Sequence, residues 1–231
     1  MTLNERSQHR DDRPSERRAG EPAKNEVATS GIKLEFTAQP NHVYFYGDVT
    51  RERCLEVTHQ LRTVVLQQTY ERALNGGNPL PVHLHVQSDG GEVYGALTLA
   101  DRLDGWGDRM PIITVAEGSC MSSGTIISVA GTRRLALPTT TFLIHQFTTW
   151  WTHTGLKFTE MQDEMVAQEI LFNQLVDHYV RNTRMDADTV RRLLARDTFM
   201  DVDRALELGL IDGVVRRARR SNRDRLLGEG R

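Results

Sequence analysis

The sequence has few of the residues that cross-link a chain or anchor it in a membrane. Its 231 residues include two cysteines, Cys54 and Cys120, which are too few for a disulfide framework or a cysteine-rich zinc site and predict a reducing compartment. No apolar stretch opens the chain as a signal peptide would. The one long uncharged run, residues 135–156, contains Pro138 and His145, which would be costly in hydrocarbon. We therefore predict a soluble, cytoplasmic protein with no membrane partner.

An excess of charge of one sign is also lacking. The 29 Lys and Arg residues nearly balance the 31 Asp and Glu residues, for a formal net charge of -2, which argues against a nucleic-acid partner. Residues 1–30 carry almost no large apolar side chain and cannot offset their ordering entropy, so we predict a disordered N-terminal extension there. Residues 31–215 then form one domain, and residues 216–231 a basic, solvated tail.

Between these tails, short β-rich runs alternate with helical ones. Residues 43–46, 82–86 and 112–115 are rich in β-branched, aromatic and other apolar side chains and are bounded by Gly, Pro or Asp, as is typical of buried strands. Residues 51–74 and 93–103 have apolar side chains at helical spacing. Strands alternating with helices imply right-handed crossovers and a mostly parallel sheet. The predicted fold class is therefore α/β, built from stacked βαβ units.

The second half of the domain is predicted to hold a short helix ending at Ala130, strands near 134–136 and 141–144, and a long helix from about Thr159 to Arg184. Thr159 and Gln162 have the spacing of a capping box. Apolar side chains recur along one face of this helix, namely Met161, Met165, Phe172, Leu175 and Tyr179. At about 1.5 Å per residue, the helix projects beyond a small domain like a handle, which favours oligomerisation.

Three polar residues mark the ends of the last predicted elements. Asp186 and Asp201 are predicted N-caps of two short helices. Gly209 is predicted to end the second of these, before a last strand near Val214.

Paired glycines follow the predicted strand that ends near Gln87. In the segment Ser88-Asp89-Gly90-Gly91, they allow the main chain to approach a ligand closely and to present N–H groups to an anion. A strand-to-helix turn also uses glycine for geometry alone, so this segment by itself is a weak indication of function.

Three serines lie near a second turn, where a strand gives way to a helix. A serine at such a turn exposes its hydroxyl, and the amide that follows it donates to an oxyanion. Ser119, Ser122 and Ser123 compete for this role, and the spacing does not choose among them. Small residues there also serve simply to pack a helix onto a sheet.

Histidines and acids supply candidates for a base and its orienter. His145 closes a predicted strand, and a nucleophilic serine needs a base whose pKa lies near neutrality. Asp197 lies in a predicted turn, where its carboxylate can point inward. His83 and His85 face the same side of one strand but have no third ligand nearby. We predict no metal and no cofactor.

Several short motifs then occur in a specific order between about His42 and Val215. They are Ser88-Asp89-Gly90-Gly91, Met121-Ser122-Ser123-Gly124, Ala136-Leu137-Pro138, Ile144-His145-Gln146, Arg196-Asp197-Thr198-Phe199-Met200 and Ala205-Leu206-Glu207-Leu208-Gly209-Leu210-Ile211-Asp212. Together they resemble the proteolytic subunit of the Clp protease, ClpP. The resemblance implies a ClpP/crotonase-like α/β fold with a projecting handle helix, and a serine protease domain over residues 31–215.

The resemblance also implies roles for individual residues. Ala130-Gly131 matches the end of the family's nucleophile helix, and counting back from it makes Ser122 the nucleophile. The implied general base is His145 and its orienter Asp197. The amides of Gly91 and Ser123 form the implied oxyanion hole, with Gly90 and Gln146 as substrate-binding residues.

The partners implied by the resemblance are a protein or peptide substrate, further copies of the chain and an AAA+ Clp ATPase. The copies would form stacked heptameric rings that enclose the active sites, with the long helix at the contact between rings. Residues 1–30 have no clear counterpart of the family's N-terminal segment, which lines the axial pore and engages the ATPase.

This chain departs from the family pattern in and near the expected site. Asp89 stands in place of a proline beside the oxyanion loop, and Ser123 stands in place of a methionine. Trp150 and Trp151 replace part of a glycine-rich stretch. A head-maturation protease of a phage or plasmid would fit these departures. The sequence also leaves open a catalytically silent structural subunit and a crotonase-type acyl-CoA enzyme, although the latter gives the serine, histidine and aspartate no role.

Overall fold

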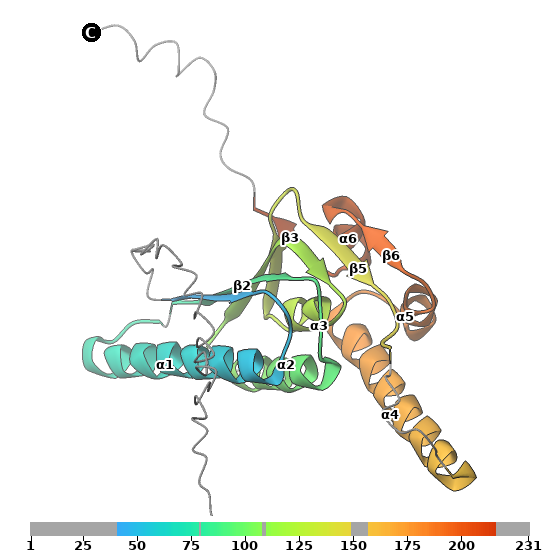
Figure 1. Cartoon of the computed structure of the whole chain (residues 1–231). Coiled ribbons are helices and arrows are strands. Elements are labelled where there is room, and N and C mark those ends of the chain that lie inside the picture. Colours follow the sequence, from blue (N-terminus) through green and yellow to red (C-terminus); the bar gives the residue numbers. More distant parts are fainter. Residues whose placement is uncertain (1–40, 79, 108–109, 149–156, 216–231) are drawn as a thin grey trace, which may run out of the picture. The chain divides into compact units, whose positions relative to one another are not determined.

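The structure is a computed structural model that describes residues 41–215 apart from 79, 108–109 and 149–156 (Figure 1). These residues belong to one structural unit, residues 37–231. The predictions for residues 1–30 and 216–231, and those for Trp150 and Trp151, lie outside the described residues.

Strands and helices alternate through the first half as the sequence predicts. In chain order they are β1 (His42–Tyr46), α1 (Arg51–Asn75), β2 (Val82–Ser88), α2 (Val93–Gly107) and β3 (Ile112–Met121). β1 pairs with β2, and β2 with β3, in parallel. The predicted α/β class with a mostly parallel sheet is therefore confirmed.

The sheet divides along β3. The first half of this strand pairs with β4 (Arg133–Ala136), which in turn pairs with β7 (Gly213–Val214). Its last residues pair instead with β5 (Thr141–Ile144), and β5 pairs in an antiparallel sense with β6 (Thr198–Met200). β3 runs six residues farther than the apolar run at 112–115 predicts, and its end leads directly into the next helix.

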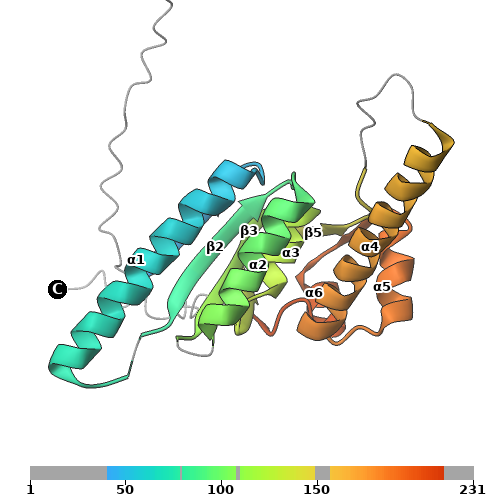
Figure 2. The ribbon, with the colours of Figure 1, turned by 90° about the horizontal axis from the view of Figure 1, so that it is seen from below.

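Helices pack on the sheet through their apolar sides. α1 and α2 lie side by side (Figure 2), and α3 (Ser123–Val129) packs against α2 and β3. The core between the helices and the sheet contains the fully buried side chains of Phe45, Leu61, Leu84, Leu99, Leu103, Ile112, Ile127 and Phe142.

The long helix α4 (Phe158–Asn182) begins one residue earlier than predicted. Lys157 is its N-cap residue, and the Glu160 carboxylate accepts a hydrogen bond of 2.9 Å from the Lys157 N–H. The predicted capping box of Thr159 and Gln162 is therefore wrong, because the helix begins at Phe158 and Glu160 caps the N–H of Lys157 instead. The stripe predicted along this helix is buried only in its second half, at Leu175 and Tyr179.

The last helices, α5 (Ala187–Leu194) and α6 (Val202–Leu208), begin directly after the predicted N-caps, and α6 ends at the predicted Gly209. The Asp186 carboxylate accepts a hydrogen bond from the Thr189 N–H, and the Asp201 carboxylate one from the Arg204 N–H. Gly209 ends α6 in the left-handed conformation, with φ of 72°. No helix in the described ranges combines the length and apolar character that a membrane crossing requires.

Candidate active site

Loops that follow four strands meet at one cleft of about 700 Å³. Its lining includes Val49 after β1, Gly90 and Gly91 after β2, Ser122 after β3 and His145 after β5. Because carboxyl ends of parallel strands meet at one edge of a sheet, strands far apart in the sequence place these residues together. Four of the predicted site residues are thus brought into one cleft.

Ser122 has an unusual backbone conformation. Its φ is 52°, and no other non-glycine residue in the described part of the chain has a positive φ. The Ser122 N–H donates to the Leu143 carbonyl at 2.8 Å, and the Ser122 carbonyl accepts from the N–H and the hydroxyl of Thr125. Positive φ at a residue other than glycine costs on the order of 1 kcal/mol or more, and such strain clusters at functional sites. The turn is the kind that exposes a nucleophilic serine.

The paired glycines are required by close approach to two neighbours. Gly90 and Gly91 have φ of 113° and 143°. A Cβ at Gly90 would lie 2.6 Å from the Ser122 Cβ, and one at Gly91 would lie 2.2 Å from the Val49 carbonyl oxygen. Any larger residue would therefore displace either the candidate nucleophile or the neighbouring loop.

The hydrogen bonds of this loop spare one amide. The Val49 N–H donates to the Gly90 carbonyl at 2.8 Å, and the Glu92 N–H donates to the Val49 carbonyl at 2.7 Å. In this parallel bridge between Val49 and Gly91, the N–H of Gly91 itself takes no part. The N–H of Ser123, at the first position of α3, is another amide without a partner inside its helix.

His145 lines the same cleft as Ser122 and is close to an acid. Its Nδ1 atom is 3.8 Å from the Oδ1 atom of Asp197, a distance at which charge attracts but no hydrogen bond forms. The side chain of Asp197 is 74% exposed and that of His145 29%. The structure thus brings the predicted orienter beside the predicted base, on its Nδ1 side.

The other nucleophiles near the turn have different surroundings. Ser119 lies within β3, paired with Thr141, and Ser123 is buried. Burial raises the pKa of Cys54 to about 11 and that of Cys120 to about 12, so both thiols are protonated and unreactive at neutral pH. Of the three serines that the sequence leaves open, Ser122 is the one that lines the cleft.

Four of the residues that the sequence singles out do not line this cleft, namely Asp89, Ser123, Gln146 and Asp197. Asp89 and Gln146 are exposed. Two acids, Asp48 and Glu92, do line the cleft, and Glu92, directly after the glycines, is paired with Arg51 at 2.9 Å. Besides the exposed Asp89, Glu92 is thus a second carboxylate next to the paired glycines.

Sequence reasoning missed several cleft residues. They are Asp48, Val49 and Thr50 on the loop after β1, Phe147 and Thr148 beyond His145, and Gln168 and Leu171 on α4. The Gly47-Asp48 turn directly after a strand was a usable signal for the first group. The sequence of α4 gave no such signal, because whether its side chains line the cleft depends on how the helix packs against the rest of the fold.

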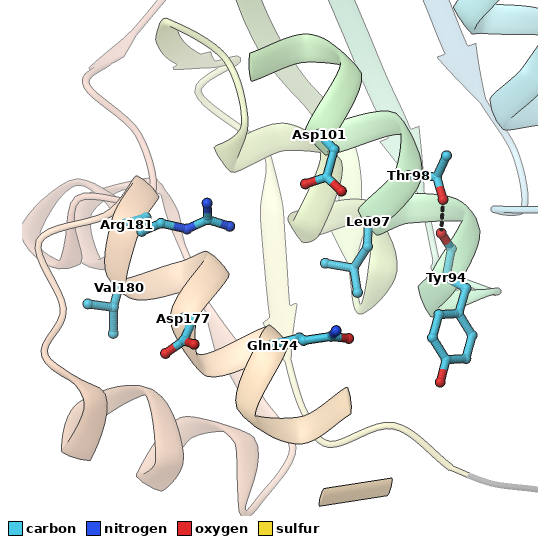
Figure 3. Close-up of a pocket in the computed structure, with 8 residues that line it drawn as sticks. All are labelled: Tyr94, Leu97, Thr98, Asp101, Gln174, Asp177, Val180 and Arg181. Carbon is cyan, nitrogen blue, oxygen red and sulfur yellow. Dashed lines mark hydrogen bonds between the residues drawn. The ribbon is translucent and has the colours of Figure 1, made fainter. Parts of the chain in front are cut away.

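A second hollow, of about 650 Å³, lies between α2 and α4 (Figure 3). Figure 3 shows Arg181 of α4 extending toward the side of α2 that carries Asp101. Tyr94, Leu97 and Gln174 also line it. It contains no serine, cysteine or histidine, so its described lining offers no nucleophile paired with a base. The cleft at Ser122 is therefore the candidate active site.

The histidines of β2 contact other side chains of the sheet. The His85 Nε2 atom lies 2.7 Å from the His42 Nδ1 atom, and the His85 Nδ1 atom lies 2.7 Å from the Glu117 carboxylate. Burial lowers the pKa of both His42 and His83. Within the described ranges, no three His, Cys, Asp or Glu side chains are arranged to hold a metal ion.

Comparison with known proteins gives concordant matches. The family model described as Clp protease matches residues 38–218. An ATP-dependent Clp protease proteolytic subunit from Deinococcus radiodurans is 32% identical over 151 residues, 63% of this chain and 71% of that protein. The protein of the same name from Bdellovibrio bacteriovorus is 30% identical over 205 residues, 84% of this chain and 94% of that protein.

Solved structures of similar fold include the following one. It is a point mutant of ClpP1 from Listeria monocytogenes, with a TM-score of 0.64 and 20% sequence identity. The match covers 78% of this chain and 93% of that chain. The expected fold is therefore confirmed.

Proposed function

Because this chain belongs to the Clp protease family, we propose that it is a serine endopeptidase and the proteolytic subunit of a Clp-type protease. Ser122 is the nucleophile, His145 the general base, and Asp197 the residue that orients the base. The observation that carries the proposal is the strained turn at Ser122, which lines one cleft together with His145 and the paired glycines.

Each step of peptide hydrolysis has a residue to perform it. His145 takes the proton of the Ser122 hydroxyl as Oγ attacks the substrate carbonyl, and returns it to the leaving amine. Water, activated by the same histidine, then attacks the acyl-enzyme and restores Ser122. Gly90, which lines the cleft, and Gln146, an exposed residue directly after the base, are the substrate-binding residues.

The developing oxyanion is stabilised by the amides of Gly91 and Ser123. Support comes from the hydrogen bonds of the loop, which use the Gly90 carbonyl and the Glu92 N–H but not the Gly91 N–H. One oxyanion donor contributes about 3 kcal/mol to lowering the barrier in acyl transfer. The absence of a side chain at Gly90 allows the main chain to lie this close to Ser122, and its absence at Gly91 allows the loop to lie against Val49.

The 3.8 Å between His145 and Asp197 is compatible with an orienting role. Catalytic hydrogen bonds are often long without substrate and tighten once it binds. A carboxylate on the Nδ1 side holds that nitrogen protonated, which leaves Nε2 free to accept the serine proton.

The protein acts as a ring-shaped homo-oligomer that encloses its active sites and cleaves protein or peptide substrates in the cytoplasm. An AAA+ Clp ATPase is the partner that would deliver substrates. The chemistry uses neither metal nor cofactor, since serine, histidine and backbone amides suffice for it.

The proposal is tested by labelling the full-length protein with a fluorophosphonate and mapping the modified peptide by mass spectrometry. We expect one adduct, on Ser122, together with hydrolysis of fluorogenic peptides, and loss of both in Ser122→Ala. Ser119→Ala, three residues earlier in β3, is the matched control and keeps both. Labelling of another serine, or full activity in Ser122→Ala, would contradict the assignment. A folded wild-type protein that takes no label would indicate a silent structural subunit.

A further inference from the structure

The buried hydroxyl of Ser123 lacks the hydrogen bond that such a group normally makes. Ser123 is 1% exposed, and its Oγ atom is the one buried side-chain polar atom in the described part of the chain without a partner. Leaving such a group unpaired costs on the order of 1–3 kcal/mol. Unpaired buried groups in native proteins are rare enough that each calls for an explanation, such as a functional role or a bound partner.

The position of this hydroxyl indicates where that partner comes from. Ser123 lines a small hollow of about 10 Å³ together with Ser122 and His145. The rest of the wall is mostly apolar, with Val93, Ile126 and Phe147 among its residues. Its other polar side chain, Tyr179, is already hydrogen bonded to the Thr125 hydroxyl at 2.6 Å.

The substrate reaches this hollow through its P1 residue, the one whose carbonyl is attacked. In the acyl-enzyme the P1 carbonyl carbon is bonded to the Ser122 Oγ, and the P1 side chain begins two bonds from that carbon. A hollow that touches both the nucleophile and the base therefore lies within reach of the P1 side chain. Its size matches about one water molecule or one hydroxyl group.

We propose that the Ser123 hydroxyl determines specificity by hydrogen bonding to a small polar P1 side chain, with serine as the preferred residue. This inference rests on the proposed function, because it takes Ser122 as the nucleophile. A serine at P1 places its hydroxyl in the hollow and pairs the buried Oγ atom. An alanine at P1 has the same size but leaves that atom unpaired, and a bulky apolar P1 side chain exceeds the space.

The experiment compares two peptides that differ only at P1, with serine in one and alanine in the other. The measured quantity is the ratio of their kcat/KM values within each protein variant, so a change in the overall rate cancels. For the full-length wild-type protein we expect a ratio of about five in favour of serine, the size of one neutral hydrogen bond. In Ser123→Ala, which keeps the backbone amide, the ratio falls to one or below, because the P1 hydroxyl is then the buried group without a partner.

Ser128→Ala is the matched control. Ser128 is a second buried serine of α3, but its hydroxyl donates to the Thr125 carbonyl at 3.2 Å and it does not line the hollow. We expect this variant to keep the wild-type ratio. Ser123→Cys, of similar volume and with a weaker donor, should give an intermediate ratio.

The outcomes separate this inference from the function on which it rests. Peptide hydrolysis that depends on Ser122 but shows a wild-type ratio near one overturns the inference alone, and indicates that a trapped water satisfies the hydroxyl. A ratio that is unchanged in Ser123→Ala and Ser123→Cys also overturns it. The absence of Ser122-dependent hydrolysis of either peptide overturns the proposed function and the inference together.

Discussion

At the scale of single residues, the candidate nucleophile and the glycine loop constrain each other. Ser122 has a positive φ, and Gly90 fits beside it because it has no side chain. Two positive-φ conformations, of which only that of Ser122 is strained, are thus in contact, and each depends on the other element staying in place. Such mutual constraint pre-organises a site, since the strain is borne by the fold before substrate arrives.

Replacing Gly90 by alanine is expected to abolish most of the activity. The new Cβ would lie 2.6 Å from the Ser122 Cβ, which forces the nucleophile to move, and a φ of 113° is unfavourable for alanine. A displacement of this kind costs about 100-fold in kcat/KM. The measurement is peptide kcat/KM together with the rate of fluorophosphonate labelling.

Gly105→Ala is the matched control for this substitution. Gly105 lies in α2, and an added Cβ there meets nothing within 4 Å. The variant should keep wild-type activity and unfold at a slightly higher denaturant concentration, because alanine favours a helix by about 0.5–1 kcal/mol over glycine. Wild-type labelling of Gly90→Ala would show that the loop tolerates a side chain beside Ser122.

The sequence could predict the identity of these residues better than their geometry. Spacing alone leaves Ser119, Ser122 and Ser123 open, because the φ angle that sets Ser122 apart arises only when β3 ends and α3 begins. The resemblance to a family resolved the choice. The sequence could not predict that the Ser123 hydroxyl is buried without a hydrogen-bond partner, because burial depends on tertiary packing and not on a local pattern.

At the scale of elements, local chemistry predicted the well-capped helices and failed where packing decides. The Asp186 and Asp201 caps and the Gly209 stop are short-range interactions and are as predicted. The extension of β3 through Glu117 and Gly118 was missed, because a charge and a glycine interrupt an apolar run. The strand continues because its last residues pair with β5, which lies about twenty residues later in the sequence.

The buried half of α4 contains a histidine that makes stability depend on pH. His178 is 1% exposed, and its Nε2 atom hydrogen bonds to the Ile126 carbonyl at 2.9 Å. Asn182 lies 3.3 Å from the Nδ1 atom, an arrangement that suits a neutral ring. Burial, with a smaller effect from the charge of Arg181, lowers the pKa of His178 below its usual value of 6.5.

We expect the free energy of unfolding to fall as the pH drops below about 6.5. In that range the unfolded chain binds a proton at His178 and the folded chain does not, so protons favour unfolding; above it the contribution is constant. The loss is up to about 1.4 kcal/mol per pH unit until the lowered pKa is reached. His42 and His83, whose pKa values are also lowered, add to it with the same sign.

His178→Gln keeps a donor and an acceptor but does not titrate. Urea unfolding at about pH 7.5 and pH 5.5 should show a smaller difference between the two conditions than in the wild type. His59→Gln, at an exposed position of α1, is the control and should leave the difference unchanged. An equal pH dependence in His178→Gln and the wild type would show that His178 does not contribute.

At the scale of the whole molecule, the exposed half of α4 is the feature that a single chain leaves unexplained. Figures 1 and 2 both show this half running away from the other elements. Phe158, Met165, Val166 and Ile170 there are between 54% and 74% exposed. Large apolar side chains gathered on one helix are typical of a surface that another molecule covers.

We expect Met165→Glu to reduce the native mass of the protein and its peptidase activity together. A carboxylate buried in an apolar contact between copies costs several kcal/mol, whereas Met165 of the isolated chain is already exposed, so the fold itself should persist with an unchanged circular dichroism spectrum. Light scattering after size-exclusion chromatography measures the mass. Glu164→Gln, at the preceding and also exposed position, is the control and should assemble as the wild type does. If Met165→Glu keeps the wild-type mass, the copies do not meet through this half of α4, and its apolar side chains must serve another partner.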